Sequence, residues 1–510
     1  MLPSGCKSTK SQVTISMSEA LQTEKLILGK DSIPVDGHSI VGIGTLTRNS
    51  AIAMGGGVLS QGLKFLVVVY LARILPVSEF GRISFAIAVN AYMFVIAHFG
   101  LPVFGSRAVA TSGVVMRGLL IEIATLRAVL AFASMLVCVG ILLLAPGVSR
   151  LETAMVAIFG LSNVVQAGLF DWVFQGLHRQ EVSAALNIIW QGGWLVLTVV
   201  GIHLGMGILS VPAALTAAGV IASVAGYVWL RQTVEISRSH ADRLEILQRC
   251  WAILKLGAPL GWGTLLVTML IWSDTLIVRL LRGQESVGLY AAGNRPALAL
   301  AMLSSFYVQG AFPMLSWAGQ EGRSALGQYF QHCYSDIALV FLPGALWAMF
   351  YAREIILLVF RNPEYLAAVP VFRVFQATFL LAAAGNFFGV GALVATHRDG
   401  VYQRVLIVTM SVFLPACAVL TYLAGNLGAS VATLGAQALL VILFTIGMRG
   451  IVQPRHAAAL LKPLMVGLAV TLVSRALGLG LYVSAGLLLA SYAGLFAARF
   501  YGTYQVEGVK

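Results

Sequence analysis

Apolar runs long enough to cross a membrane follow one another along most of this 510-residue chain. A run of about 18 or more apolar residues spans the hydrocarbon core of a bilayer as a helix. Charged residues make up only 10% of the sequence, against roughly 25% in a soluble domain. Charges this sparse cannot cover the surface of a soluble protein of this size. The sequence therefore predicts an all-α polytopic membrane protein.

Fourteen segments have the length and composition of membrane helices. They lie near 50–72, 82–103, 118–145, 153–176, 182–202, 207–230, 256–279, 286–310, 334–353, 367–395, 402–424, 428–448, 460–478 and 480–499. The predicted domains are a flexible cytoplasmic tail at 1–47, a six-helix bundle at 48–230, a cytoplasmic amphipathic connector at 231–255, a second six-helix bundle at 256–450, and helices 13 and 14 with a C-terminal tail at 451–510.

Two stretches about two hundred residues apart read alike. The first motif, 71–81, and the second motif, 277–288, each place an Arg after an apolar run, a Glu six positions later, and then a Gly. Such an internal repeat in an apolar chain favours a membrane protein of two related halves. Transporters are commonly built this way, with the substrate path at the interface between the repeats.

Basic residues indicate the orientation of the helices. With a cytoplasmic N-terminus, 21 Lys and Arg fall in inner segments and 9 in outer ones, and positive residues gather on the cytoplasmic side. We therefore predict that both termini are cytoplasmic. The net charge of +13 then matches anionic lipid, and without a basic patch interleaved with aromatics the sequence does not indicate nucleic-acid binding.

The sequence contains no pattern typical of an enzyme. It has no Gly-Lys-Ser/Thr phosphate loop and no Gly-x-Ser-x-Gly elbow,. The five cysteines are scattered and show no metal-ligand spacing,. We therefore expect no catalytic residues, no metal and no cofactor.

Three basic residues fall well inside predicted spans: Lys64, Arg127 and Arg295. A charge at the centre of a bilayer costs roughly 2.5–3.5 kcal/mol on insertion scales, so it is kept only where it is paired or faces water. We expect all three to face one internal cavity and to bind substrate there. Ion pairs between helices are the structural alternative.

Two acids and several amides also lie in predicted spans. Asp274 and Asp171 are candidates for ion coupling, because a desolvated carboxyl group is able to carry a proton. A structural pairing with a neighbouring arginine is the alternative for both. Asn163, Gln166 and Asn294 complete the predicted substrate-binding set, since sugars need hydrogen-bond donors and acceptors.

Three stretches resemble one family. Tyr70 to Ala86, Phe99 to Arg107, and Ser273 to Leu281 with the following Val287 to Ala292 resemble polysaccharide-biosynthesis flippases of the Wzx type. These belong to the multidrug/oligosaccharidyl-lipid/polysaccharide exporter superfamily. The resemblance implies two six-helix bundles related by a pseudo-twofold axis, two extra helices, and alternating access.

The resemblance also implies a function. Such proteins flip a polyprenyl-pyrophosphate-linked oligosaccharide across the bacterial inner membrane for exopolysaccharide, O-antigen or capsule synthesis. The expected partners are this lipid-linked substrate, membrane lipid, and polysaccharide polymerase or export proteins. Two alternatives stay open at this point: a cation-coupled multidrug exporter of the same superfamily, and an integral-membrane polysaccharide polymerase or glycosyltransferase.

Overall fold

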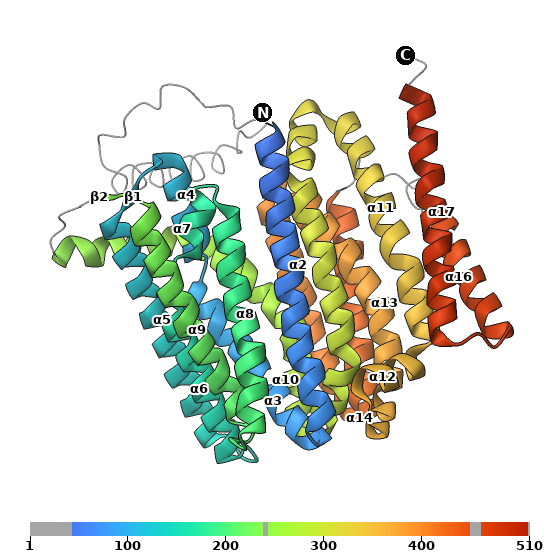
Figure 1. Ribbon diagram of the computed structural model, residues 1–510, viewed down its shortest axis with the longest axis horizontal. Coiled ribbons are helices and arrows are strands. Elements are labelled where there is room, and N and C mark those ends of the chain that lie inside the picture. The colour runs from blue at the N-terminus through green and yellow to red at the C-terminus, as the bar shows by residue number, and fades with distance from the viewer. Residues whose placement is uncertain (1–42, 238–242, 397, 449–460, 508–510) are drawn as a thin grey trace, which may run out of the picture. The chain divides into compact units, whose positions relative to one another are not determined.

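The computed structural model describes residues 43–237, 243–396, 398–448 and 461–507 (Figure 1). Most of the predicted tail at 1–47 lies outside these residues. The N-terminal elements are α2 Ile43–Ile74, α3 Val77–His98, α4 Leu101–Ser112, β1 Val115–Met116, α5 Arg117–Leu144, α6 Arg150–Gln166, α7 Asp171–Gly176, α8 Gln180–His203, α9 Ser210–Thr233 and β2 Ile236–Ser237. The remaining elements are α10 Arg243–Glu321, α11 Arg323–Phe350, α12 Ala352–Phe360, η1 Pro363–Ala368, α13 Val369–Asn386, η2 Phe387–Val394, α14 Asp399–Gly447, α16 Leu461–Ala476 and α17 Leu481–Glu507.

Helices dominate the described chain. Nine of them are long and apolar enough to cross a membrane, by length and composition. Two of the nine contain a non-helical kink, at Gly283 in α10 and at Ala424–Gly425 in α14, so each combines two of the predicted segments. The prediction of an all-α polytopic membrane protein is confirmed, and the number fourteen stays a prediction.

The chain divides by its internal contacts into two compact units. Unit 1 comprises Met1–Gly56 and Asn90–Leu265, and unit 2 comprises Gly57–Val89 and Leu266–Lys510. The segment 57–89 thus groups with the second half of the chain. The domain boundaries given above, which follow chain order, stay a prediction.

Unit 1 is a helix bundle in which α5, α6, α8 and α9 lie side by side (Figure 1). At one end of this bundle β1 pairs in parallel with β2, through Val115 with Ile236 and Met116 with Ser237. β1 follows α4 in the chain, and β2 lies within the predicted connector 231–255. Residues 238–242 of the connector lie outside the described chain, and helix resumes at Arg243.

The structure breaks the predicted helix 153–176 into α6 and α7. The break, residues 167–170, lets the carbonyl of Leu169 accept a hydrogen bond from Arg127 of α5 at 3.0 Å. The prediction missed this break because the sequence there is apolar throughout, and the contact that stabilises it comes from another helix.

A second break separates α3 from α4. Phe99 and Gly100 both have positive φ, 28° and 77°, a region that favours glycine. The first part of α10 fits against this break, and a Cβ added at Gly261 would lie 2.7 Å from Cγ of Phe99. Gly257 and Gly261 thus allow close approach of the helices, as small residues four apart do in membranes.

Unit 2 contains the two repeated motifs, and they pack against each other. A Cβ at Gly81 of the first motif would contact the Gln284 carbonyl oxygen of the second, and a Cβ at Gly288 would contact the Val77 carbonyl oxygen of the first. Arg82, next in the chain, donates to Gln284 Oε1 at 2.9 Å. The two repeated motifs therefore contact each other reciprocally, and this contact places residues 57–89 in unit 2.

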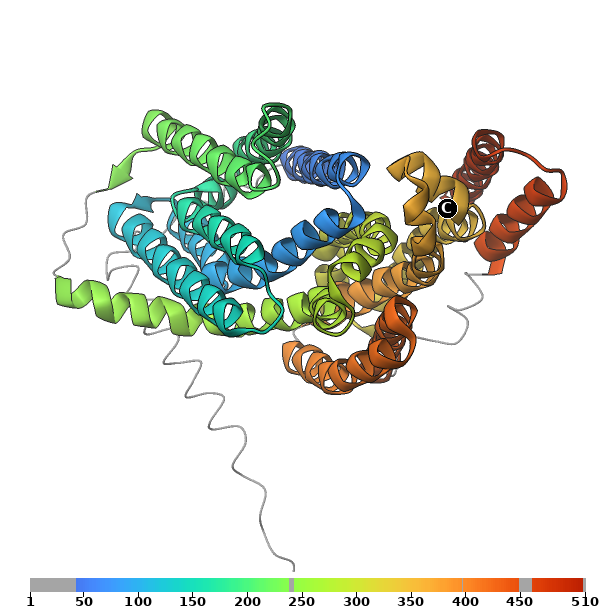
Figure 2. The same cartoon turned by 90° about the horizontal axis from the view of Figure 1, so that it is seen from below.

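The rest of unit 2 surrounds α13. This helix contacts α11 and α14 and continues directly into the π-helix η2. The view along the helices in Figure 2 shows α16 and α17 in red at the edge, and α16 packs on α11. The irregular turn of η2 lies in the predicted segment 367–395.

Candidate functional site

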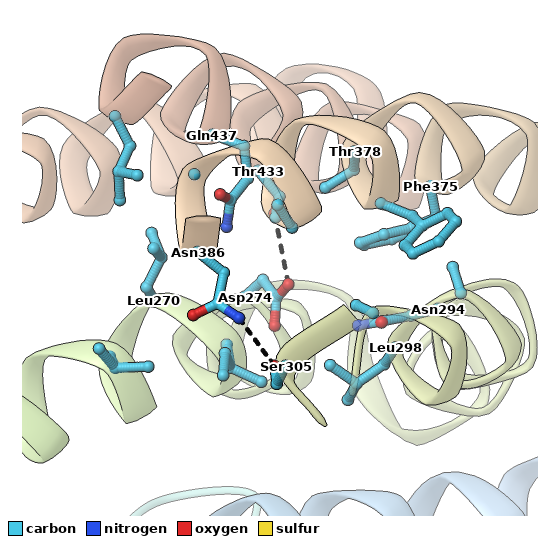
Figure 3. Close-up of a pocket in the computed structure, with 18 of the residues that line it drawn as sticks. Leu270, Asp274, Asn294, Leu298, Ser305, Phe375, Thr378, Asn386, Thr433 and Gln437 are labelled. Carbon is cyan, nitrogen blue, oxygen red and sulfur yellow. Dashed lines mark hydrogen bonds between the residues drawn. The ribbon is translucent and has the colours of Figure 1, made fainter. Parts of the chain in front are cut away.

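A pocket of about 220 Å³ lies within unit 2, between α10, α13 and α14. Figure 3 shows Asp274, Asn294 and Leu298 of α10 facing Phe375 and Thr378 of α13 and Thr433 and Gln437 of α14. The sequence builds it by placing a polar residue among apolar neighbours on each of the three helices. Pockets of this kind, apolar with a few placed polar groups, are typical ligand sites.

Asp274 is the acid of this pocket and is only 1% exposed. Its Oδ1 accepts from the backbone N–H of Thr275 at 2.6 Å and from the Thr275 hydroxyl at 3.2 Å. Its Oδ2 accepts from the Tyr290 hydroxyl at 2.7 Å and lies 3.3 Å from Thr433 Oγ1. Every one of these partners is neutral. Asp274 is thus held by hydrogen bonds, and no ion pair within 4.0 Å is found for it in the described chain.

The rest of the pocket wall combines amides with aromatic rings. Asn386 Nδ2 donates to Ser305 Oγ at 3.0 Å, shown as a dashed line in Figure 3. Asn294 and Gln437 add two further amides to the wall, while the apolar part includes Phe375, Phe379 and Phe444. Such a wall offers a ligand both hydrogen bonds and apolar contact.

Arg295 follows Asn294 on α10 but does not line this pocket. Its side chain is 7% exposed, and its guanidinium carbon lies 4.3 Å from the centre of the Trp272 ring. Its Nη1 and Nη2 are both buried without a hydrogen-bond partner among the described residues. A stacked guanidinium with free donors in one plane has the geometry that phosphate and carboxylate prefer.

Lys64 lies at the middle of the candidate span Met54–Ile74. It is ten residues from each end, which is about 15 Å along a helix. Its side chain is exposed on α2, and the described residues provide it with no hydrogen bond or ion pair. Since an ammonium group at this depth needs water or a partner, this face of α2 requires a wet environment.

Arg127 is buried in unit 1 and has two partners. It donates from Nη1 to the Leu169 carbonyl and from Nη2 to His98 Nε2 at 2.8 Å. Arginine only donates, so His98 accepts through Nε2, and its Nδ1–H donates to the Phe94 carbonyl at 2.9 Å. The Nε of Arg127 is buried without a partner in the described chain. Arg127 thus stabilises the break after α6 and retains one free donor.

The other predicted residues of unit 1 lie on α6 and α7. Asn163 Nδ2 donates to Asn90 Oδ1 at 2.9 Å, while Asn163 Oδ1 is buried and unpaired within the described residues. Gln166, at the end of α6, is also buried. Asp171 begins α7, and its Oδ2 lies 3.4 Å from Gln175 Nε2.

The structure thus brings two predicted residues, Asp274 and Asn294, into one pocket. Arg127, Asn163, Gln166 and Asp171 belong to unit 1, and Lys64 and Arg295 belong to unit 2. Their meeting in one cavity stays a prediction. The sequence analysis did not predict Tyr290 and Thr433 as partners of Asp274. Tyr290 nevertheless lies in one of the stretches that resemble the flippase family.

Several solved membrane proteins are similar to this chain in fold. The lipid II flippase MurJ in an inward closed conformation superposes with a TM-score of 0.64 at 12% identity, covering 91% of this chain and all of that one. An inward-facing multidrug resistance transporter of the MATE family in the MOP superfamily gives 0.62 at 14% identity, covering 80% of this chain and 98% of that one. At such identities the likeness establishes the fold, and it confirms the predicted all-α polytopic architecture.

A third structure with this fold is a MOP superfamily transporter from Pyrococcus furiosus Vc1. Its TM-score is 0.52 at 14% identity, covering 83% of this chain and 96% of that one, and it is described as having a binding pocket of reverse polarity. No curated protein sequence matches the chain.

Family assignment comes from the sequence. The model of the family described as polysaccharide biosynthesis protein matches residues 46–318, which is 273 of 510 residues. The match includes the two repeated motifs, Asp274 and Arg295. The chain therefore belongs to the polysaccharide biosynthesis protein family.

Proposed function

We propose that this protein flips a polyprenyl-pyrophosphate-linked oligosaccharide from the cytoplasmic to the periplasmic leaflet of a bacterial inner membrane. Both termini are then cytoplasmic, and polysaccharide polymerase or export proteins take up the product for exopolysaccharide, O-antigen or capsule synthesis. A sugar chain cannot cross hydrocarbon, whereas its polyprenyl tail can stay in it. The family and the transporter fold support this proposal.

The observation that supports the proposal most strongly is the buried guanidinium of Arg295, whose Nη1 and Nη2 have no hydrogen-bond partner among the described residues. A buried guanidinium without hydrogen bonds is costly unless something pairs with it. Its two free nitrogens and the Trp272 ring beneath it suit a pyrophosphate oxygen pair. Lys64 at mid-span and the free Nε of Arg127 are the further cationic groups that we assign to the head group, with Asn163, Gln166 and Asn294 as contacts to sugar hydroxyls.

Alternating access is part of the proposal. In the predicted orientation, the reciprocal contact of the two motifs lies at the outer ends of their helices. Its opening and closing would alternate with exposure of the cationic groups to either side. Asp274 is our candidate for the coupling group because it is a buried carboxylate whose hydrogen-bond partners are all neutral. Asp171 is the second candidate.

The test compares Arg295→Ala with Arg295→Lys in cells that depend on the protein for glycan export. Lysine keeps the charge but loses the planar fork, so we expect export to fall further in the alanine variant. Arg282→Ala is a control on the same helix, because Arg282 is exposed and its Nε and Nη2 already donate to the carbonyls of Thr421 and Tyr422. Full export by both Arg295 variants at equal protein levels would remove Arg295 from binding.

A cation-coupled multidrug exporter is the second candidate function. The pocket around Asp274 favours it, since one carboxylate among Phe375, Phe379 and Phe444 suits a lipophilic cation. The unpaired buried guanidinium of Arg295 disfavours it. Drug accumulation in cells separates the two functions: the flippase proposal predicts the same drug accumulation with and without the protein.

A further inference from the structure

The helix α11 contains a proline in its interior, Pro343. Proline has no N–H to bond the carbonyl four residues earlier, and its ring displaces that turn. In a membrane, backbone groups freed in this way need partners from neighbouring helices. In the structure, α17 of the C-terminal helix pair α16 and α17 provides hydrogen bonds to the neighbouring backbone pair of α11, Val340 and Gly344.

Tyr492 of α17 hydrogen-bonds the backbone N–H of Gly344 and the carbonyl of Val340, which form the helical pair next to the proline. Its hydroxyl accepts from the backbone N–H of Gly344 at 3.1 Å and donates to the carbonyl of Val340 at 2.9 Å. A phenol has one donor hydrogen and acceptor lone pairs, so a single side chain serves both backbone groups. Phenylalanine at this position would serve neither.

The C-terminal pair also contacts the proline itself and the turns beyond it. A Cβ at Gly467 of α16 would lie 2.6 Å from Pro343 Cβ. Trp347 Nε1 donates to Ser484 Oγ at 2.9 Å, and the Tyr351 hydroxyl donates to the Leu479 carbonyl at 3.1 Å. The contacted residues, at 340, 343, 344 and 347 of α11 and at 351 just after its end, recur at helical spacing and form one stripe,.

Other residues of α11 contact the wall of the Asp274 pocket. Phe341 meets Phe379, which lines that pocket, edge to face with ring centres 5.4 Å apart. Nearer its start, Phe330 stacks on Phe388 of η2 at 5.3 Å, close to Asn386 of the pocket. A change in the bend of α11 therefore moves the pocket wall.

We propose that α16 and α17 form a brace that fixes the proline bend of α11, and through it the wall of the Asp274 pocket. Tyr492 is the positioning residue of this brace. Only the effect of the brace on transport rests on the proposed function. Its effect on the bend of α11 is testable without any transport assay.

The experiment is a double-mutant comparison of Tyr492→Phe and Pro343→Ala. Alanine at 343 restores the N–H that bonds the Leu339 carbonyl and removes the ring that displaces this turn. We then expect the Gly344 N–H to bond the Val340 carbonyl directly. The loss of the Tyr492 hydroxyl should then matter with Pro343 and not with alanine. The readout is the maleimide labelling rate of Cys333, on α11, in protein whose other cysteines are replaced by alanine.

We expect Tyr492→Phe to change the labelling rate by about fivefold or more with Pro343 present, because both hydrogen bonds of the hydroxyl are lost and each contributes to the local opening equilibrium. With Pro343→Ala we expect no change. An equal effect in both backgrounds, or no effect in either, overturns the brace. If Tyr492→Phe protein cannot be recovered, its recovery in the Pro343→Ala background supports the brace, and its loss there too overturns it.

A glycine pair provides the control for packing. Gly467→Val should alter Cys333 labelling, whereas Gly486→Val on α17 should not, because a Cβ at Gly486 meets nothing within 4 Å. Identical labelling in the two variants contradicts the brace. A protein that passes these tests but does not move a lipid-linked glycan would refute the proposed function and leave the brace standing.

Discussion

The protonation state of Asp274 is open to a direct thermodynamic test. An ionised carboxylate only accepts hydrogen bonds, whereas a protonated one must also donate. The Thr275 N–H and the hydroxyls of Thr275 and Tyr290 all donate toward Asp274. The hydroxyls are equally able to accept from a protonated carboxyl group, so the strength of the coupling decides between the two states. Our hypothesis is that Asp274 is ionised in this conformation and ready to take up the coupling ion.

The perturbation is a double-mutant cycle of Asp274→Ala and Tyr290→Phe, read as the free energy of unfolding. Neutral hydrogen bonds between membrane helices couple by about 0.6 kcal/mol on average. Hydrogen bonds to a charged group are worth about 1.5–3 kcal/mol, and 2.7 Å between the two oxygens fits that class. We expect a coupling energy of about 1.5–3 kcal/mol.

The assay is reversible unfolding of the purified protein in mixed detergent micelles. Tyr307 and Asp336 provide a matched tyrosine–aspartate pair in unit 2, half-buried and longer at 3.0 Å, for which we expect a smaller coupling energy. A coupling at or below about 0.6 kcal/mol for the Asp274 pair would mean that its carboxyl group is protonated, and the reasoning would be refuted.

Two further predictions concern packing and burial. Gly81→Val should lower the free energy of unfolding by about 1–3 kcal/mol, because a Cβ there meets a backbone oxygen. Gly62→Val should leave it unchanged, because a Cβ there meets nothing within 4 Å. Equal midpoints of thermal unfolding for the two variants would contradict the close contact at Gly81. His98→Phe should lower the free energy of unfolding by about 1–3 kcal/mol, because it leaves Arg127 Nη2 without an acceptor. His98→Gln should lower it less. An equal loss in unfolding free energy for these two variants would show that the hydrogen bond contributes nothing.

The fold class was predictable from the sequence, and the site only in part. Apolar runs decide that a chain crosses the membrane as helices, and the repeated motifs around Gly81 and Gly288 identified two matching segments. Their mutual contact was not predictable, because matching sequence alone does not give proximity.

Single buried charges were predictable, but their partners were not. Asp274 was a candidate from its depth alone, yet Thr433 lies 159 residues further along the chain. The break after α6 depends on Arg127 reaching Leu169 from another helix. Both are tertiary contacts, and helical periodicity carries no information about which neighbouring helix supplies a partner.

The central claim, that a buried cationic site moves a pyrophosphate-linked glycan, is tested most directly by flipping in proteoliposomes. Purified protein is reconstituted with a polyprenyl-pyrophosphate oligosaccharide in one leaflet, and a lectin reports the glycan in the other. We predict transfer by the wild type, a loss of transfer for Arg295→Ala, and no transfer of a neutral polyprenyl glycoside. Equal transfer of the neutral and the pyrophosphate-linked glycan, or undiminished transfer by Arg295→Ala, would contradict the claim.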